Sequence, residues 1–94
     1  DILYGGQGDD VLNGNADRDT LVGGEGQDFL YGGDDVDTAY GNVGNDLMYG
    51  DGDDDYLHGG QGDDTVDGGN DDDQLFGGIG NDSIVGSSGE DTLG

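Results

Sequence analysis

Apolar residues recur at every ninth position along this chain. Counted from Gly5, the sequence divides into ten nonapeptides without insertion, after a partial repeat of four residues. Position one of each nonapeptide is glycine, position six is aspartate and position eight is apolar. The apolar positions are Leu3, Leu12, Leu21, Leu30, Ala39, Met48, Leu57, Val66, Leu75, Ile84 and Leu93.

Positions seven to nine of each repeat predict a three-residue β-strand. Side chains alternate along a strand, so position eight points to one face and positions seven and nine point to the other. Position eight is expected to face inwards. Positions one to six are rich in Gly, Asn and Asp, which tolerate the positive φ angles of turns. No stretch is free of glycine for long enough to favour a helix.

Position four doubles the period from nine to 18 residues. Glycine and aspartate alternate there through nine repeats, and only the last repeat departs from the rule. Two nonapeptides then form one turn of a solenoid, and strands one turn apart stack in parallel at about 4.7–4.9 Å. The sequence therefore predicts an all-β fold: a right-handed parallel β-roll (β-solenoid) with 18 residues per turn and two short-stranded parallel sheets.

The charge of the chain points towards cations as partners. The sequence has 24 acidic residues against one arginine, no lysine and one histidine, with a net charge of -23. Such a polyanion is repelled by nucleic acid and by anionic membrane surfaces. No apolar run is long enough to insert into a membrane, and the absence of cysteine excludes disulfides.

Low hydrophobicity with high net charge is also typical of disordered chains. Ordering the backbone costs about 1–2 kcal/mol per residue, which the apolar positions alone do not offset. In the predicted roll, moreover, the position-six aspartates form two columns of like charges that repel each other. Because there is no lysine, a bound cation must lie between them. The columns are Asp10, Asp28, Asp46, Asp64 and Asp82, and Asp1, Asp19, Asp37, Asp55, Asp73 and Asp91.

The available ligands indicate which cation this is. Carboxylates and the carbonyls of glycine-rich turns are hard oxygen ligands, and the soft ligands of zinc, copper and iron are nearly absent. Calcium accepts several carbonyls in irregular geometry, whereas magnesium prefers to keep its waters. The residues therefore favour calcium.

The repeat resembles the repeats-in-toxin (RTX, hemolysin-type) calcium-binding nonapeptide, GGxGxDxUx, in which U is a large apolar residue. The best copies are GGQGDDVLN (5–13), GGQGDDTVD (59–67) and GGIGNDSIV (77–85). In that family calcium lies between consecutive loops of a parallel β-roll, held by position-six carboxylates and by backbone carbonyls of the first positions. The resemblance implies that Asp10 and Asp28 share one ion and Asp19 and Asp37 another, with up to about eight bracketed sites. It implies carbonyl ligands from Gly5, Gly6, Gly8, Gly14, Gly23, Gly24, Gly26, Gly32, Gly41, Gly44, Gly50, Gly59, Gly60, Gly62, Gly68, Gly77, Gly78 and Gly80.

The even-numbered loops depart from the strict pattern. They replace the position-four glycine with aspartate, either as an extra carboxylate near each ion or as an exposed turn residue at positive φ. Both interpretations remain open. Asp1 lacks a loop of its own, so its role as a ligand is weaker. The position-four residues concerned are Asp17, Asp35, Asp53 and Asp71.

No catalytic residues are expected. His58 has no serine or cysteine nucleophile in a recognisable arrangement, and a repeated array gives every carboxylate pair the same environment, whereas acid–base catalysis needs unequal ones. The aromatic residues at position nine either stack across strands or form a face for a neighbouring domain, a glycan or another copy of the chain. They lie in the columns Tyr4, Val22, Tyr40, His58 and Phe76, and Tyr31 and Tyr49.

Taken with the resemblance, these features predict a calcium-binding repeat module that folds on binding calcium outside the cell. The module would be the stabilising, secretion-coupled part of a larger secreted or cell-surface bacterial protein exported by a type I system. The alternatives are a structural rod or spacer of a surface-layer, fibril or adhesin protein, and a permanently disordered acidic spacer. We expect one segment over residues 1–94, with the partial repeat at 1–4 and ten nonapeptides at 5–94, cut from a longer array.

Overall fold

The computed structural model describes residues 1–94 as β-strands joined by short loops, without a helix. None of its segments is therefore a helix that is long and apolar enough to span a membrane. The strands are β1 (Ile2–Gln7), β2 (Val11–Asn15), β3 (Thr20–Glu25), β4 (Phe29–Gly33), β5 (Thr38–Val43), β6 (Leu47–Asp51), β7 (Tyr56–Gln61), β8 (Thr65–Gly69), β9 (Gln74–Ile79), β10 (Ser83–Ser87) and β11 (Thr92–Leu93).

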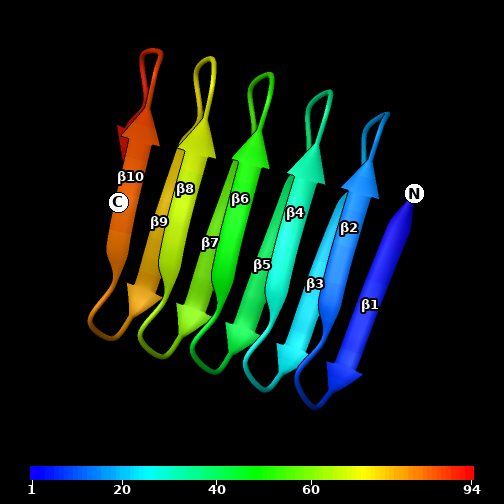
Figure 1. Ribbon diagram of the computed structural model, residues 1–94. Coiled ribbons are helices and arrows are strands. Elements are labelled where there is room, and N and C mark those ends of the chain that lie inside the picture. The colour runs from blue at the N-terminus through cyan, green and yellow to red at the C-terminus, as the bar shows by residue number, and fades with distance from the viewer.

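The strands form two parallel sheets that lie face to face (Figure 1). Odd-numbered strands make a six-stranded sheet in the order β1-β3-β5-β7-β9-β11, and even-numbered strands make a five-stranded sheet in the order β2-β4-β6-β8-β10. Every pairing joins residues 18 apart, as Leu3 with Leu21 and Leu12 with Leu30. The predicted solenoid with 18 residues per turn is confirmed.

The strands are longer than the three residues predicted. All except β11 contain five or six residues, because pairing continues into positions one and two and, in β1, β3, β5, β7 and β9, into position three. Gly6 pairs with Gly24 and Gln7 with Glu25 beyond the apolar segment. A ladder needs only backbone N–H and C=O groups, which glycine keeps. Alternation of apolar side chains therefore underestimated strand length here.

The core is a single layer of position-eight side chains between the two sheets. Leu21, Leu30, Met48, Leu57 and Leu75 have no exposed surface. Burial of position eight decreases at the ends of the stack, where no further turn covers the side chain. Leu3 and Ile84 are only partly buried, and Leu93 is 55% exposed.

Aromatic side chains stack along the outer faces of both sheets. Tyr31 and Tyr49 lie nearly parallel, with ring centroids 5.4 Å apart and an interplanar angle of 9°. On the other sheet, Tyr56 contacts Tyr40 and Phe76, with centroid distances of 6.0 and 5.5 Å. These contacts support cross-strand stacking as one role of the aromatic residues. The contribution of Tyr56, which lies at position seven, was not predicted.

We expect Leu57→Ala to lower the free energy of unfolding by about 2–5 kcal/mol, because it leaves a cavity in a core that is one side chain thick. Chemical denaturation followed by circular dichroism measures this. Leu93→Ala is the matched control, since Leu93 occupies the same repeat position but is 55% exposed. Equal losses for the two variants would show that the position-eight layer is not the core.

Candidate metal centre

The loops between strands form two edges of the roll, at opposite ends of the strands (Figure 1). We use the word loop for positions one to six of a repeat, which include the last residues of the strand that enters the edge. The loops of odd-numbered repeats form the odd edge and span residues 5–10, 23–28, 41–46, 59–64 and 77–82. The set from even-numbered repeats is the even edge; its loops span residues 14–19, 32–37, 50–55, 68–73 and 86–91. Each loop ends on a position-six aspartate.

The position-six aspartates are buried although they lie in loops. In the middle of the roll they are at most 2% exposed: Asp19, Asp28, Asp37, Asp46, Asp55, Asp64 and Asp73. Asp10, Asp82 and Asp91, in the outermost loops, are partly buried. The structure does not bring the Asp1 carboxylate into this column, because its side chain is 96% exposed. The position-six residues therefore form two largely buried columns, one at each edge.

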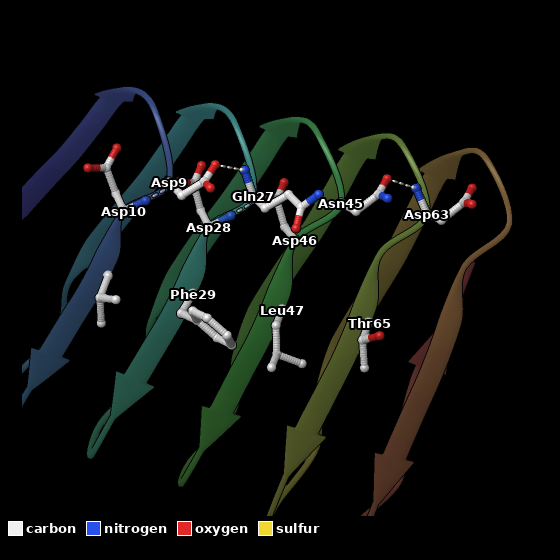
Figure 2. A pocket seen from close by; sticks show the side chains of 11 residues that line it. Asp9, Asp10, Gln27, Asp28, Phe29, Asn45, Asp46, Leu47, Asp63 and Thr65 are labelled. Atoms are coloured by element: carbon white, nitrogen blue, oxygen red, sulfur yellow. Dashed lines mark hydrogen bonds between the residues drawn. The ribbon is translucent and has the colours of Figure 1, made fainter.

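One carboxylate oxygen of nearly every position-six aspartate accepts a hydrogen bond from the preceding turn. The backbone N–H of Asp10 donates to Oδ1 of Asp28 at 2.8 Å, and that of Asp28 donates to Oδ1 of Asp46 at 2.9 Å (Figure 2). On the even edge, the N–H of Asp37 donates to Oδ1 of Asp55 at 2.8 Å. The bond repeats at intervals of 18 residues, so each column fixes the register between consecutive loops.

The second oxygen of the carboxylate has no donor in the protein. Burying a charged oxygen without a partner is costly, and here the cost recurs in nearly every loop. When these carboxylates are ionised, the two columns therefore need positive charge beside these atoms. The unpartnered buried atoms are Oδ2 of Asp10, Asp19, Asp28, Asp37, Asp46, Asp55, Asp64 and Asp73.

Position-one glycines leave space in front of these oxygens. A Cβ built on Gly5 would lie 2.6 Å from Oδ2 of Asp10 and 2.6 Å from the carbonyl oxygen of Gly23, one turn further on. On the even edge, a Cβ on Gly14 would lie 2.6 Å from Oδ2 of Asp19. Position one never has a positive φ. Glycine is needed there for space, which the prediction from turn conformations did not identify.

Positive φ belongs instead to positions two and four, in every repeat. Most of these residues are glycine, but Asn15, Asn42, Asp51 and Ser87 occupy position two at φ between 71° and 80°. Asn and Asp enter this region more readily than most residues. The two positive-φ residues bend each loop back so that position six points over position one.

Position-five side chains form a further ladder outside the aspartate column. Oδ1 of Asp9 accepts from the N–H of Gln27, and Oδ1 of Asn45 accepts from the N–H of Asp63, both at 2.8 Å (Figure 2). These bonds run in the opposite direction to those of position six. They border a groove of about 430 Å³ along the odd edge. Sequence reasoning missed this role, although position five is mostly polar.

The position-four aspartates lie on the surface of the even edge. Asp17, Asp35, Asp53 and Asp71 are exposed and have φ between 71° and 76°, as expected of turn residues. The backbone N–H groups of the first three donate to Oδ2 of the next aspartate, as from Asp17 to Asp35 at 3.1 Å. Their part in binding an ion stays a prediction.

Burial raises the pKa of several position-six carboxyl groups. Loss of solvation raises the pKa of Asp46 and Asp73 from 3.8 to about 6 and that of Asp55 to about 8. The same cause raises the pKa of Asp37 and Asp64. The N–H bond from the preceding turn opposes these shifts, and neighbouring carboxylates add to them. A positive partner would restore the ionised form.

The donor set fits a hard cation that accepts backbone ligands. No group of three or more Asp, Glu, His or Cys side chains converges on one point, so side chains alone do not complete a site. What converges instead is one free carboxylate oxygen and the carbonyl oxygen of the next turn, as at Asp10 and Gly23. Mixed carboxylate and carbonyl oxygens are the ligands that calcium takes in flexible geometry.

The fold and these loops define a parallel β-solenoid whose loop edges carry buried, unpartnered carboxylates. The family model described as RTX calcium-binding nonapeptide repeat, in four copies, matches residues 1–30, 31–66 and 58–93. The chain therefore belongs to the RTX calcium-binding repeat family, as the resemblance of its nonapeptides predicted. No curated protein and no solved structure matches it.

We expect Gly41→Ala to lower the free energy of unfolding by about 1–3 kcal/mol or more, because the added Cβ would overlap Oδ2 of Asp46 and the Gly59 carbonyl. Denaturation of the calcium-saturated chain measures the loss. Gly52→Ala is the control, since a Cβ on Gly52 meets only the Gly33 carbonyl at 3.8 Å and its φ is ordinary. A loss as large for Gly52→Ala would contradict the steric role of position one.

Acid should stabilise the roll when calcium is removed by a chelator. A carboxyl whose folded pKa is raised binds its proton more tightly in the folded chain. The protonated carboxyl contributes its full stabilisation below pH 3.8, the ordinary pKa of Asp. This contribution is lost as the pH rises through about 6 for Asp46 and Asp73 and through about 8 for Asp55. Circular dichroism in chelator should therefore show more β-structure at pH about 4 than at pH about 8.

Asp55→Asn should flatten this pH dependence, because it removes the most shifted group. Asp9→Asn, at an exposed position on the other edge, should leave it unchanged. A metal-free chain that becomes less ordered on acidification would contradict the assignment of these buried carboxyls.

Proposed function

We propose that this chain is a calcium-binding repeat module that folds when it binds calcium outside the cell. The observation that carries the proposal is the set of eight buried Oδ2 atoms without a donor, four at each edge. Membership of the RTX calcium-binding repeat family supports calcium as the ion. The disordered-spacer alternative gives these atoms no role.

The proposed ligands are the position-six carboxylates and the carbonyls of the glycine-rich loop positions. Each interval between consecutive loops of one edge would form a site, as between Asp28 and Asp46 or between Asp37 and Asp55. About eight intervals of this kind are available. A bound calcium ion would supply positive charge to two neighbouring carboxylates.

The chain's own residues explain why folding should depend on the ion. The core is one layer of side chains, and the net charge is -23. Stacking the loops brings position-six carboxylates into neighbouring turns, where their repulsion and desolvation oppose closure of the roll. Binding to the folded state alone stabilises that state by mass action.

Dependence on calcium suits a protein that works outside the cell. Extracellular calcium modules bind in the range of about 10⁻⁴–10⁻³ M. In a cell interior with little free calcium such a chain would stay expanded, and it would fold on reaching the exterior. We therefore propose a secreted or cell-surface bacterial protein as its context, with secretion coupled to folding.

The test is a titration of the 94-residue chain with calcium, and separately with magnesium, followed by far-ultraviolet circular dichroism. We expect a cooperative transition to β-structure with calcium and none with magnesium at the same concentrations. Asp46→Asn should raise the calcium midpoint at least about tenfold, because it removes a ligand from two intervals. Asp67→Asn removes the same charge from the outer face of β8, where it bonds Ser87, and should leave the midpoint nearly unchanged.

A chain that gives no transition with calcium would contradict the proposal, as would equal midpoints for Asp46→Asn and Asp67→Asn.

A further inference from the structure

The loops at the two edges differ in their backbone hydrogen bonds. On the odd edge, the backbone N–H at position four donates to the position-three carbonyl of the following turn, as from Gly26 to Val43 at 2.9 Å. On the even edge, the backbone N–H at position three donates to the position-two carbonyl of the preceding turn, as from Gly52 to Gly33 at 3.1 Å. The strands that enter the odd edge are accordingly one residue longer. The two edges are two structural classes of loop.

Position four also differs between the edges. Gly26 and Gly44, on the odd edge, have φ of 126° and 128°, and at these angles a Cβ would overlap the position-four carbonyl of the preceding turn. On the even edge, Asp35 and Asp53 have φ of 74° and 71°. The loop class does not depend on the aspartate: in the last even loop position four is Gly89, and Ser88 still donates to the Gly69 carbonyl at 3.0 Å.

The acidic residues are unequally divided between the edges. Even-edge loops contain fourteen of the 24 acidic residues and odd-edge loops contain eight, and the other two are Asp1 and Asp67. Much of the excess is the exposed position-four column, which is held in line by the N–H bonds from Asp35 to Asp53 at 3.1 Å and from Asp53 to Asp71 at 3.2 Å.

The excess negative charge lies in loops that also contain buried carboxylate oxygens without a hydrogen-bond donor. Asp37, Asp55 and Asp73 are at most 2% exposed, and their Oδ2 atoms have no donor. Each is two residues from a position-four carboxylate of the same loop. A more negative site raises the affinity for a cation through both local potential and the charge of the ligand set.

We propose that the two edges are unequal classes of calcium site, and that the even edge binds calcium more tightly because of its position-four carboxylates. This inference rests on the proposed calcium function. The carboxylates of Asp17, Asp35, Asp53 and Asp71 act through their charge on the ions held by position six. The odd edge, without this column, fills at higher calcium concentration.

Two triple variants of the full chain test the proposal. Asp35→Asn, Asp53→Asn and Asp71→Asn together remove three charges from the even edge. Asn keeps an acceptor and tolerates positive φ, as Asn15 and Asn42 show. The matched control on the odd edge combines Asp9→Asn, Glu25→Gln and Asp63→Asn. Asn45 already fills the ladder position of Asp9 and Asp63 with an amide.

Calorimetric titration with calcium chloride at low ionic strength should resolve a tighter and a weaker group of sites in the unsubstituted chain. The even-edge triple should weaken the tighter group about three- to tenfold, and the odd-edge triple should affect only the weaker group. In about 1 M salt, where the screening length falls to about 3 Å, the difference should largely disappear.

If binding and folding occur in one step, the two triple variants are compared by the calcium concentration at the midpoint of the circular dichroism transition. The even-edge triple variant must then raise this midpoint more than the odd-edge triple variant does. Single variants, Asp53→Asn against Asp63→Asn, make the same comparison if a triple variant does not fold in saturating calcium. If the chain binds calcium but the even-edge and odd-edge variants shift the calcium midpoint equally, or the odd-edge variants shift it more, the inference of unequal edges is overturned and the proposed function is not. An unsubstituted chain that takes up no calcium would instead contradict the proposed function.

Discussion

The stacked position-six carboxylates are the interaction on which the rest of the roll depends. In the middle of the roll each uses Oδ1 to accept the N–H of the turn before it and leaves Oδ2 buried without a donor, as in Asp28 and Asp55. The first bond sets the register of the loops, and the second oxygen creates an electrostatic cost in nearly every turn. Loop register and the buried, unpartnered oxygen therefore arise from the same side chain, next to a core that is a single apolar layer.

Glycine serves two separate physical purposes in the loops. At positions two and four the backbone needs positive φ, and Asn, Asp or Ser can replace glycine there, as Asn42 and Asp53 do. At position one φ is not positive, but a side chain would occupy the space of the free carboxylate oxygen and of the next carbonyl. Steric exclusion is the stricter requirement, because every residue other than glycine has a Cβ.

Repetition does not make the roll symmetrical. The two sheets share one apolar layer and one register, but the loops that close them differ in hydrogen bonding and in charge. The outer faces differ as well: Tyr31 and Tyr49 form a parallel pair on one sheet, and Tyr56 links Tyr40 and Phe76 on the other. A nine-residue sequence pattern therefore produces an 18-residue structural unit with two distinct halves.

The sequence by itself determined the period, the two-sheet solenoid, the inward position eight and the two aspartate columns, because each follows from side-chain type at fixed spacing. It did not determine strand length, since pairing through Gly6 and Gln7 uses backbone groups common to all residues. Nor did it reveal the exposure of Leu93, the ladder from Asp9 to Gln27 or the space that Gly5 leaves. These depend on which atoms of neighbouring turns meet, and contacts between residues 18 apart exist only once the chain has closed into the roll.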